Sequence, residues 1–455
     1  MENQTCSFPD KLTDEQYAIL SELVGTPSFN SQIPPEGSEA EIQQAIWRML
    51  ENHEGIRLSQ LQVGDQSNGR FNILAQKGEP LEHTKFALMM YVHTDTIKKE
   101  SNWENDYKLT RGTHGFLQGV GVYDMKAGVM MLIDLLQTID VPPGATVVGV
   151  FGVGEERNSD GMKRLLKWDG MEKMNMVLSP EICPQGEADE RANPEIDAHK
   201  RIITGRPGHI KIELVSTVPP SHAHDLNKPG ANDVLNSTVF QIRESIIAIA
   251  RKQFGKDFNF GEKNFSVPHQ QTFGSKESAS RTTKAIGHMG IHIVSPLTEE
   301  WVRGTATQVK ESLEKRLNWY EHGIGVELGE WGVSYPAYVT PTDTPEAEAL
   351  LDWVGKFYGS AAWRPSQKGA WADSNLGADF FNRLNAKRAE RPSILSADGS
   401  RSPIRKVGWY DIAPIGGRAH EGGEFVVEAS VAQMCHCYAG FVRTVLPKLT
   451  GTRRT

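Results

Sequence analysis

Histidines and carboxylates recur along this chain at positions that follow apolar segments or lie in glycine-rich loops. These residues are His93 with Asp95, Asp124, the adjacent pair Glu155 and Glu156, Glu181, and His420. Imidazole nitrogens and carboxylate oxygens are ligands that zinc, manganese and cobalt share. A cation held by such ligands can activate water for attack on a polarised bond. The residue types therefore predict a metal-dependent hydrolase.

His93 and Asp95 close the segment Tyr91-Val-His93-Thr-Asp95, which follows an apolar run. In a strand, residues two apart point to the same face. Both side chains are thus expected at the carboxyl end of a buried strand, where open α/β sheets bind their ligands. A metal-binding imidazole needs a carboxylate or carbonyl on its other ring nitrogen, which Asp95 could supply. Taken alone, the two residues also fit a hydrogen-bonded surface pair.

Asp124 lies between the glycine-rich segment Gly119-Val-Gly121 and an expected helix. An aspartate there can cap the helix N-terminus, or its two oxygens can bridge two cations. Glu155 and Glu156 follow another apolar strand. Adjacent carboxylates are costly to crowd without a cation. Because neighbours in an extended segment point apart, one can bind metal while the other acts as a general base. A solvated loop is the alternative.

Glu181 ends a further short strand, and His420 lies in the glycine-rich segment Ile415–Phe425. The glycines indicate close backbone packing near the site. Each residue alone has an ordinary structural explanation. Their recurrence at the ends of successive expected strands is what indicates a common site.

Two patterns of hydrophobic residues predict the elements that position these residues. Continuous apolar runs predict strands at 71–76, 86–92, 145–153 and 176–179, and helical spacing predicts helices at 39–52, 125–139, 345–358 and 426–446. Strands that are apolar on both faces and alternate with helices predict an α/β fold, with a mostly parallel sheet and helices on both faces. The polar segment Ala386–Lys406 is expected to be an exposed loop.

A change of pattern near Gly205 predicts an inserted domain. Strands are expected at 209–218 and 290–294, and helices at 232–252 and 299–320. This block has the composition of a separate α+β layer. We therefore expect a catalytic domain at residues 1–204 and 333–455, interrupted by a domain at residues 205–332.

Composition excludes several classes of function. The net charge is −8, and there is no Lys/Arg run to bind nucleic acid. No apolar run approaches the roughly 18 residues of a membrane span, and the N-terminus lacks a signal-peptide pattern. Four cysteines in 455 residues fit a reducing cytoplasm. Cys435-His436-Cys437 is expected in a helix, where neighbours point apart, so packed thiols are favoured over a metal site.

The order and spacing of all these motifs resemble the co-catalytic metallopeptidase family of glutamate carboxypeptidases, aminoacylases, acetylornithine deacetylase and succinyl-diaminopimelate desuccinylase. The resemblance implies two divalent cations per subunit, zinc first, with manganese or cobalt as alternatives. Asp124 would bridge them. One cation would add Glu156 and His420, and the other His93 and Glu181. Glu155 would be the general base, and Asp95 would orient His93.

The insert resembles the lid of that family, which implies a homodimer formed through this domain. Ser221-His222-Ala-His224 precedes Gly230-Ala-Asn232, and this spacing resembles a lid motif whose histidine reaches the partner's active site. Counting back from Asn232 assigns that role to His222, with His224 as the alternative. Such a histidine could stabilise an oxyanion.

Some positions depart from the family pattern. Val92 and Val120 replace a usual Gly and Arg, Trp371 lies where the family has a Gly-Gly-Thr-Asp motif, and the Arg of a lid Asp-x-Arg motif is missing near His292. Arg is the preferred bidentate partner of a carboxylate, so recognition of a substrate carboxylate is in doubt. The expected function is cleavage of an amide or peptide bond in a small polar molecule. An aminohydrolase acting on an aromatic amine and an inactive binding or assembly protein stay open.

Overall fold

The computed structural model describes residues 9–29, 39–64, 69–99, 103, 107–182, 200–221, 228–254, 269–274, 283–293, 297–330, 334–364, 372–390 and 405–451. These residues form two compact units. Unit 1 comprises Met1–Thr204, Val339–Pro365 and Ala372–Thr455, and the described part of unit 2 lies within Gly205–Tyr338. His222, His224 and Trp371 lie outside the described residues.

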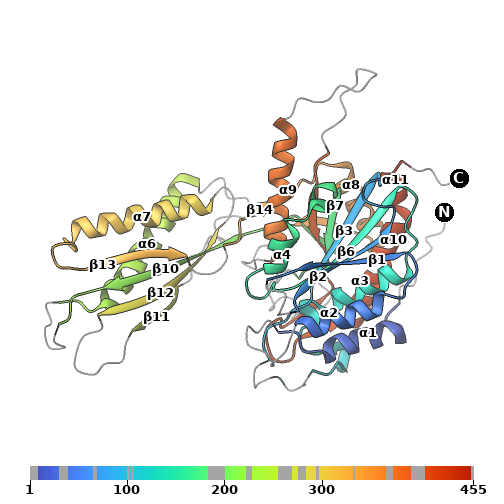
Figure 1. Ribbon diagram of the computed structural model, residues 1–455, viewed down its shortest axis with the longest axis horizontal. Coiled ribbons are helices and arrows are strands. Elements are labelled where there is room, and N and C mark those ends of the chain that lie inside the picture. Colours follow the sequence, from blue (N-terminus) through green and yellow to red (C-terminus); the bar gives the residue numbers. More distant parts are fainter. Residues whose placement is uncertain are drawn as a thin grey trace. The chain divides into compact units, whose positions relative to one another are not determined.

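Unit 1 is built on a large sheet, whose strands β1, β2, β3, β6 and β7 are labelled in Figure 1, and it also contains a smaller sheet. In spatial order the large sheet contains β1 (Ile56–Gln62), β2 (Phe71–Gly78), β6 (Ala145–Gly152), β3 (Phe86–His93), β7 (Met176–Ser179), β16 (Gly408–Asp411), β8 (Arg201–Ile203) and β15 (Ala362–Arg364). The smaller sheet contains β17 (Gly416–Gly417), β18 (Phe425–Val427), β5 (Phe116–Gln118) and β4 (Thr110–Arg111). The helices are α1 (Asp14–Gly25), α2 (Glu39–Leu50), α3 (Ala127–Thr138), α4 (Asp160–Leu165), α8 (Pro345–Tyr358), α9 (Asp373–Glu390), α10 (Glu428–Thr444) and α11 (Leu446–Leu449).

The central strands β6, β3, β7 and β16 run parallel, whereas β1 and β2 extend the sheet antiparallel. Every residue of β3, β6 and β7 is buried. Strands buried on both faces need apolar residues at every position, which explains their uninterrupted apolar runs. The prediction of a mostly parallel α/β sheet is confirmed.

Helices cover both faces of this sheet. On one face, Gly149 of β6 lies so close to α3 that an added Cβ would meet Leu136 Cδ1 at 2.8 Å. Phe71 and Ile73 of β2 belong to the same core as α3. Asn72, between them, points to the other face, where its side chain donates to the carbonyl of Gly161 in α4 (2.8 Å). The strands are therefore enclosed between two helical layers.

Unit 2 has its own sheet and core. Its strands are, in spatial order, β11 (His269–Gly274), β12 (Lys284–Ile293), β10 (Gly208–Thr217) and β13 (Gly325–Glu330), all antiparallel. Two helices, α6 (Ala231–Phe254) and α7 (Glu299–Arg316), pack with this sheet around one apolar cluster. The short strands β9 (Gly205–Arg206) and β14 (Tyr338–Val339) pair with each other.

His292 of β12 is paired with His209 on the neighbouring strand β10, and the centroids of the two rings are 5.0 Å apart. Burial lowers the pKa of both imidazoles, that of His209 to about 3. Unit 2 therefore carries a pair of imidazoles that are neutral at neutral pH.

Several predicted boundaries were wrong, and two of them lie in the C-terminal part of the chain. The segment expected to be a loop from Ala386 continues helix α9 as far as Glu390. Asn385 stabilises this end of the helix, because its side chain bonds to both the N–H (2.9 Å) and the carbonyl (3.0 Å) of Val407. Strand β18 occupies the start of the last predicted helix, which begins only at Glu428.

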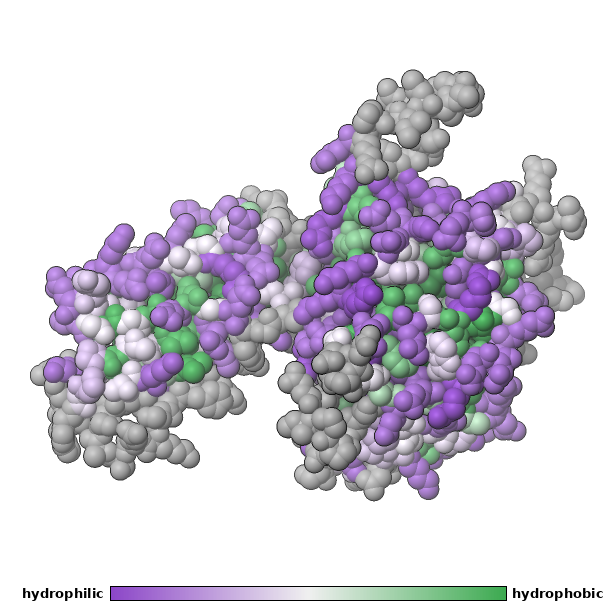
Figure 2. Space-filling model, in the orientation of Figure 1, coloured by the Kyte–Doolittle hydropathy of each residue, from purple (hydrophilic) through white to green (hydrophobic). Residues whose placement is uncertain are grey.

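The face of each unit seen in Figure 2 mixes hydrophilic with scattered apolar residues. Within the described ranges, no helix is both long enough and apolar enough to cross a membrane. Cys435 and Cys437 are buried free thiols in α10. Among the described residues, neither belongs to a group that could hold a metal ion.

Candidate metal centre

The parallel strands of unit 1 end at the same edge of the sheet, and the predicted residues follow those ends. His93 is the last residue of β3, Glu155 and Glu156 come shortly after β6, and Glu181 comes shortly after β7. Because β6, β3 and β7 are adjacent and parallel, their carboxyl ends lie side by side. The order of strands thus brings residues from three separate segments to one place.

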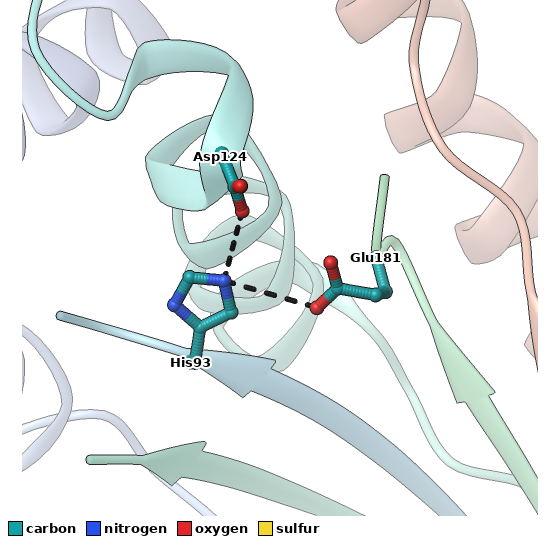
Figure 3. Close-up of side chains that lie close together, drawn as sticks. All are labelled: His93, Asp124 and Glu181. Atoms are coloured by element: carbon teal, nitrogen blue, oxygen red, sulfur yellow. Dashed lines mark hydrogen bonds and ion pairs between the residues drawn. The ribbon is translucent and has the colours of Figure 1, made fainter. Parts of the chain in front are cut away.

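The first group of possible ligands is buried. Nε2 of His93 lies 2.9 Å from Oδ1 of Asp124 and 3.8 Å from Oε2 of Glu181. Both carboxylates point towards the same ring nitrogen (Figure 3). The three ligand atoms lie within 4.8 Å of one another.

The second group reaches the surface of unit 1. Nε2 of His420 lies 2.9 Å from the Glu156 carboxylate and 3.3 Å from Oδ2 of Asp124. The side chain of His420 is 48% exposed. His420 itself has a positive φ of 65°, within the loop between β17 and β18.

Asp124 belongs to both groups. Its Oδ1 faces His93, whereas its Oδ2 faces His420. It lies in the turn η3 (Val122–Lys126), which joins the small sheet to α3; its own backbone is not helical, and the peptide bond after it is cis. One carboxylate therefore offers one oxygen to each of two neighbouring groups.

The imidazoles and carboxylates perturb one another's pKa. Burial alone would lower the pKa of His93 and His420, but hydrogen bonds with Asp124 and other carboxylates outweigh it. The pKa of His93 is raised well above its usual range, and that of His420 to about 12. Burial raises the pKa of Glu156 to about 7. Without a cation, both imidazoles are therefore protonated at neutral pH.

Asp95 contacts both His93 and the pair of glutamates. Nδ1 of His93 lies 3.1 Å from the backbone oxygen of Asp95 and 3.6 Å from its Oδ1. The Asp95 carboxylate accepts the backbone N–H groups of Glu155 (3.1 Å) and Glu156 (3.0 Å). Asp95 therefore holds the turn after β6 as well as the His93 ring.

Glu155 is half-buried beside the first group. Burial raises the pKa of its carboxyl well above the usual range, the positive charge of His93 lowers it, and the charge of Glu181 raises it further. Glu155 therefore lies within electrostatic reach of residues at the ends of β3 and β7.

Two residues near the site, Tyr91 and Glu424, make contacts that the sequence did not predict. Tyr91, on the same face of β3 as His93, donates a hydrogen bond to the buried Asp373 of α9. Glu424, four residues after His420, accepts backbone N–H groups from the Asp124 loop. Glu424 lies within the glycine-rich segment Ile415–Phe425, but the sequence does not show which groups its carboxylate contacts.

Comparisons with known proteins agree with this geometry. The pattern of Peptidase family M20/M25/M40 matches residues 89–379, more than half of the chain. A succinyl-diaminopimelate desuccinylase from Anaplasma marginale (strain Florida) is 29% identical over 161 residues, which are 35% of this chain and 39% of that protein. The chain thus matches about two-fifths of the length of this curated relative.

Solved structures share the fold over nearly the whole chain. A tripeptidase from Staphylococcus aureus subsp. aureus Mu50 has a TM-score of 0.66 at 13% identity, covering 96% of this chain and all (100%) of that one. The YXEP protein of Bacillus subtilis, described as a dinuclear metal binding peptidase from the M20 family, has a TM-score of 0.59 at 11% identity, covering 95% and 98%. With its family pattern and its fold in agreement, the chain belongs to Peptidase family M20/M25/M40.

Proposed function

We propose that this protein is a metal-dependent hydrolase that cleaves a carbon–nitrogen bond, namely an amide or peptide bond in a small polar molecule. One observation carries the proposal: the Asp124 carboxylate lies between His93 and His420, with one oxygen towards each. Family membership supports the same conclusion, since the relatives described above are peptidases and a desuccinylase.

The donor set fits two divalent cations. Each group offers one imidazole nitrogen and two carboxylates, with ligand atoms within 4.8 Å of one another. We assign His93, Asp124 and Glu181 to one cation and Asp124, Glu156 and His420 to the other. Mixed nitrogen and oxygen donors favour zinc, with manganese or cobalt as alternatives. When bound, such cations polarise a carbonyl and lower the pKa of water.

The residues around the ligands supply the proton transfers. Glu155 accepts a proton from the attacking water on its carboxylate. It then returns that proton to the leaving nitrogen, so that the amine departs neutral and the carboxylate of Glu155 is regenerated. A raised pKa suits a group that must both accept and return a proton near neutral pH. Asp95 keeps Glu155 in place through the backbone N–H of that residue.

We further propose that the protein acts as a homodimer through unit 2, with His222 of one subunit acting as an oxyanion donor in the partner's site. The support is the motif around Ser221 and Gly230 and its resemblance to the lid of the family. We also propose that the protein acts in the cytoplasm, in keeping with its few cysteines.

A panel of substrates tests the proposed reaction. Purified protein loaded with zinc would be incubated with dipeptides, tripeptides, N-acylated amino acids and aromatic amines, and products followed by mass spectrometry. Release of a free amine together with a carboxylic acid is expected, and Glu155→Gln should slow it by at least ~10²-fold. Release of ammonia from the aromatic amines alone would instead identify an aminohydrolase.

A further inference from the structure

Glu424 has a buried carboxylate aimed at the loop that carries Asp124. It directly precedes strand β18 and is only 2% exposed. Its Oε2 accepts the N–H of Gly121 (2.9 Å), and its Oε1 accepts the N–H groups of Tyr123 (2.8 Å) and Asp124 (2.9 Å). Three backbone donors from one short loop thus converge on one side chain.

These hydrogen bonds connect the segments that carry the possible ligands. Asp124 contributes to both groups, and His420 lies four residues before Glu424. The backbone oxygen of Glu424 also accepts the N–H of Gly119 (3.4 Å). The loop of Asp124 and the loop of His420 are therefore joined at both the main chain and the side chain of Glu424.

Glu424 is an acceptor for three backbone N–H groups in the present shape of this loop. Gly121 has a φ of 70°, and η3 has no side-chain cap at its N-terminus. A buried N–H that loses its acceptor is destabilising, because the group stays desolvated without a partner. A carboxylate offers several acceptor positions on two oxygens, whereas an amide of the same shape offers only one oxygen and would point N–H₂ at a donor.

We propose that Glu424 is a positioning residue for the metal centre: it fixes the Asp124 loop so that the two Asp124 oxygens face His93 and His420. Glu424 itself binds neither cation and touches no substrate. The inference rests on the proposed function, since it assigns a role in metal binding. Residues that orient metal ligands typically affect metal affinity or activity by 10- to 100-fold when mutated.

The matched control is Glu428, another buried glutamate four residues further along. It is 3% exposed and accepts hydrogen bonds from the Leu12 N–H (3.3 Å) and from Arg111 (2.9 Å). Within the described ranges, Glu428→Gln therefore changes a comparable buried carboxylate whose hydrogen bonds are to Leu12 and Arg111, not to the loops of Asp124 or His420.

Metal affinity would be measured by titrating metal-free full-length protein with Zn²⁺ in a calorimeter, and geometry from the visible absorption of the Co²⁺-loaded form. Glu424→Gln should weaken Zn²⁺ binding by about 10- to 100-fold and shift the Co²⁺ bands. Glu428→Gln should lower thermal stability while leaving both properties as in the wild type.

Wild-type affinity and an unchanged Co²⁺ spectrum in folded Glu424→Gln would overturn the inference. If that variant does not fold, Glu424→Asp replaces it, and unchanged affinity in this shortened carboxylate would overturn the inference equally. Absence of Zn²⁺ binding in the wild type would instead overturn the proposed function, so the two failures are distinct.

Discussion

At the scale of single residues, the adjacent acids Glu155 and Glu156 face different partners. Nε2 of His420 lies 2.9 Å from the Glu156 carboxylate. Glu155, in contrast, belongs to neither of the two possible ligand groups found among the described residues. We predict that Glu155→Gln keeps its metal content while turnover falls by at least ~10²-fold, the usual loss for a general base. Asp124→Ala should lose metal from both groups. Elemental analysis beside steady-state kinetics checks both, and metal loss in Glu155→Gln would mean that the two acids are assigned wrongly.

The pKa values of the imidazoles lead to a second prediction. His93 and His420 have raised pKa values, so both carry a proton at neutral pH in the metal-free protein. Cations must displace these protons, and also the fraction of a proton that Glu156 carries near its pKa of about 7. Filling both groups with Zn²⁺ should therefore release at least two protons, and binding should weaken as pH falls. Calorimetry in two buffers with different ionisation enthalpies measures the number released. A binding heat that does not depend on the buffer would contradict the prediction.

At the scale of elements, the turn η3 is preceded by a glycine in the left-handed region, where any side chain would be strained. Gly121 has a φ of 70°, and an added Cβ would lie 2.2 Å from Thr96 Cγ2. Gly115 has a similar φ of 75° but open space around it. Gly121→Ala should destabilise the protein by about 2–5 kcal/mol, from backbone strain and overpacking together.

Gly115→Ala is the control for backbone strain alone and should cost only about 1–2 kcal/mol. Urea denaturation of both variants measures the two costs. Equal losses in the two variants would show that close packing against Thr96 does not matter. Zn²⁺ affinity should fall for Gly121→Ala alone, since only this glycine adjoins η3.

The elements also show how much of the site the sequence could predict. The convergence of His93, Glu156 and Glu181 follows from strand order, because apolar runs revealed the strands and parallel strands share an edge. The role of Glu424 could not be predicted, since its donors lie 300 to 303 residues away in the sequence. Likewise, the contacts of Asp95 with backbone N–H groups depend on a turn whose geometry no side-chain pattern encodes.

At the scale of the whole molecule, the proposed dimer makes one active site depend on two subunits. His222→Ala should keep fold and metal but lose turnover by ~10²–10³-fold if His222 is an oxyanion donor. Mixing it with Glu155→Gln should restore some activity, because a mixed dimer contains one site with both residues intact. Labelled subunits verify exchange, and no recovery despite exchange would refute sharing, as would wild-type activity of His222→Ala.

The central claim is that the two groups joined by Asp124 hold the cations needed for hydrolysis. Its most direct test removes all metal by exhaustive chelation, confirms the removal by elemental analysis, and titrates Zn²⁺ back while amide cleavage is followed. We predict no activity in the metal-free protein, and recovery that saturates at about two cations per subunit, as expected for two adjoining sites that share one carboxylate. Full activity in protein shown to be free of metal would contradict the account.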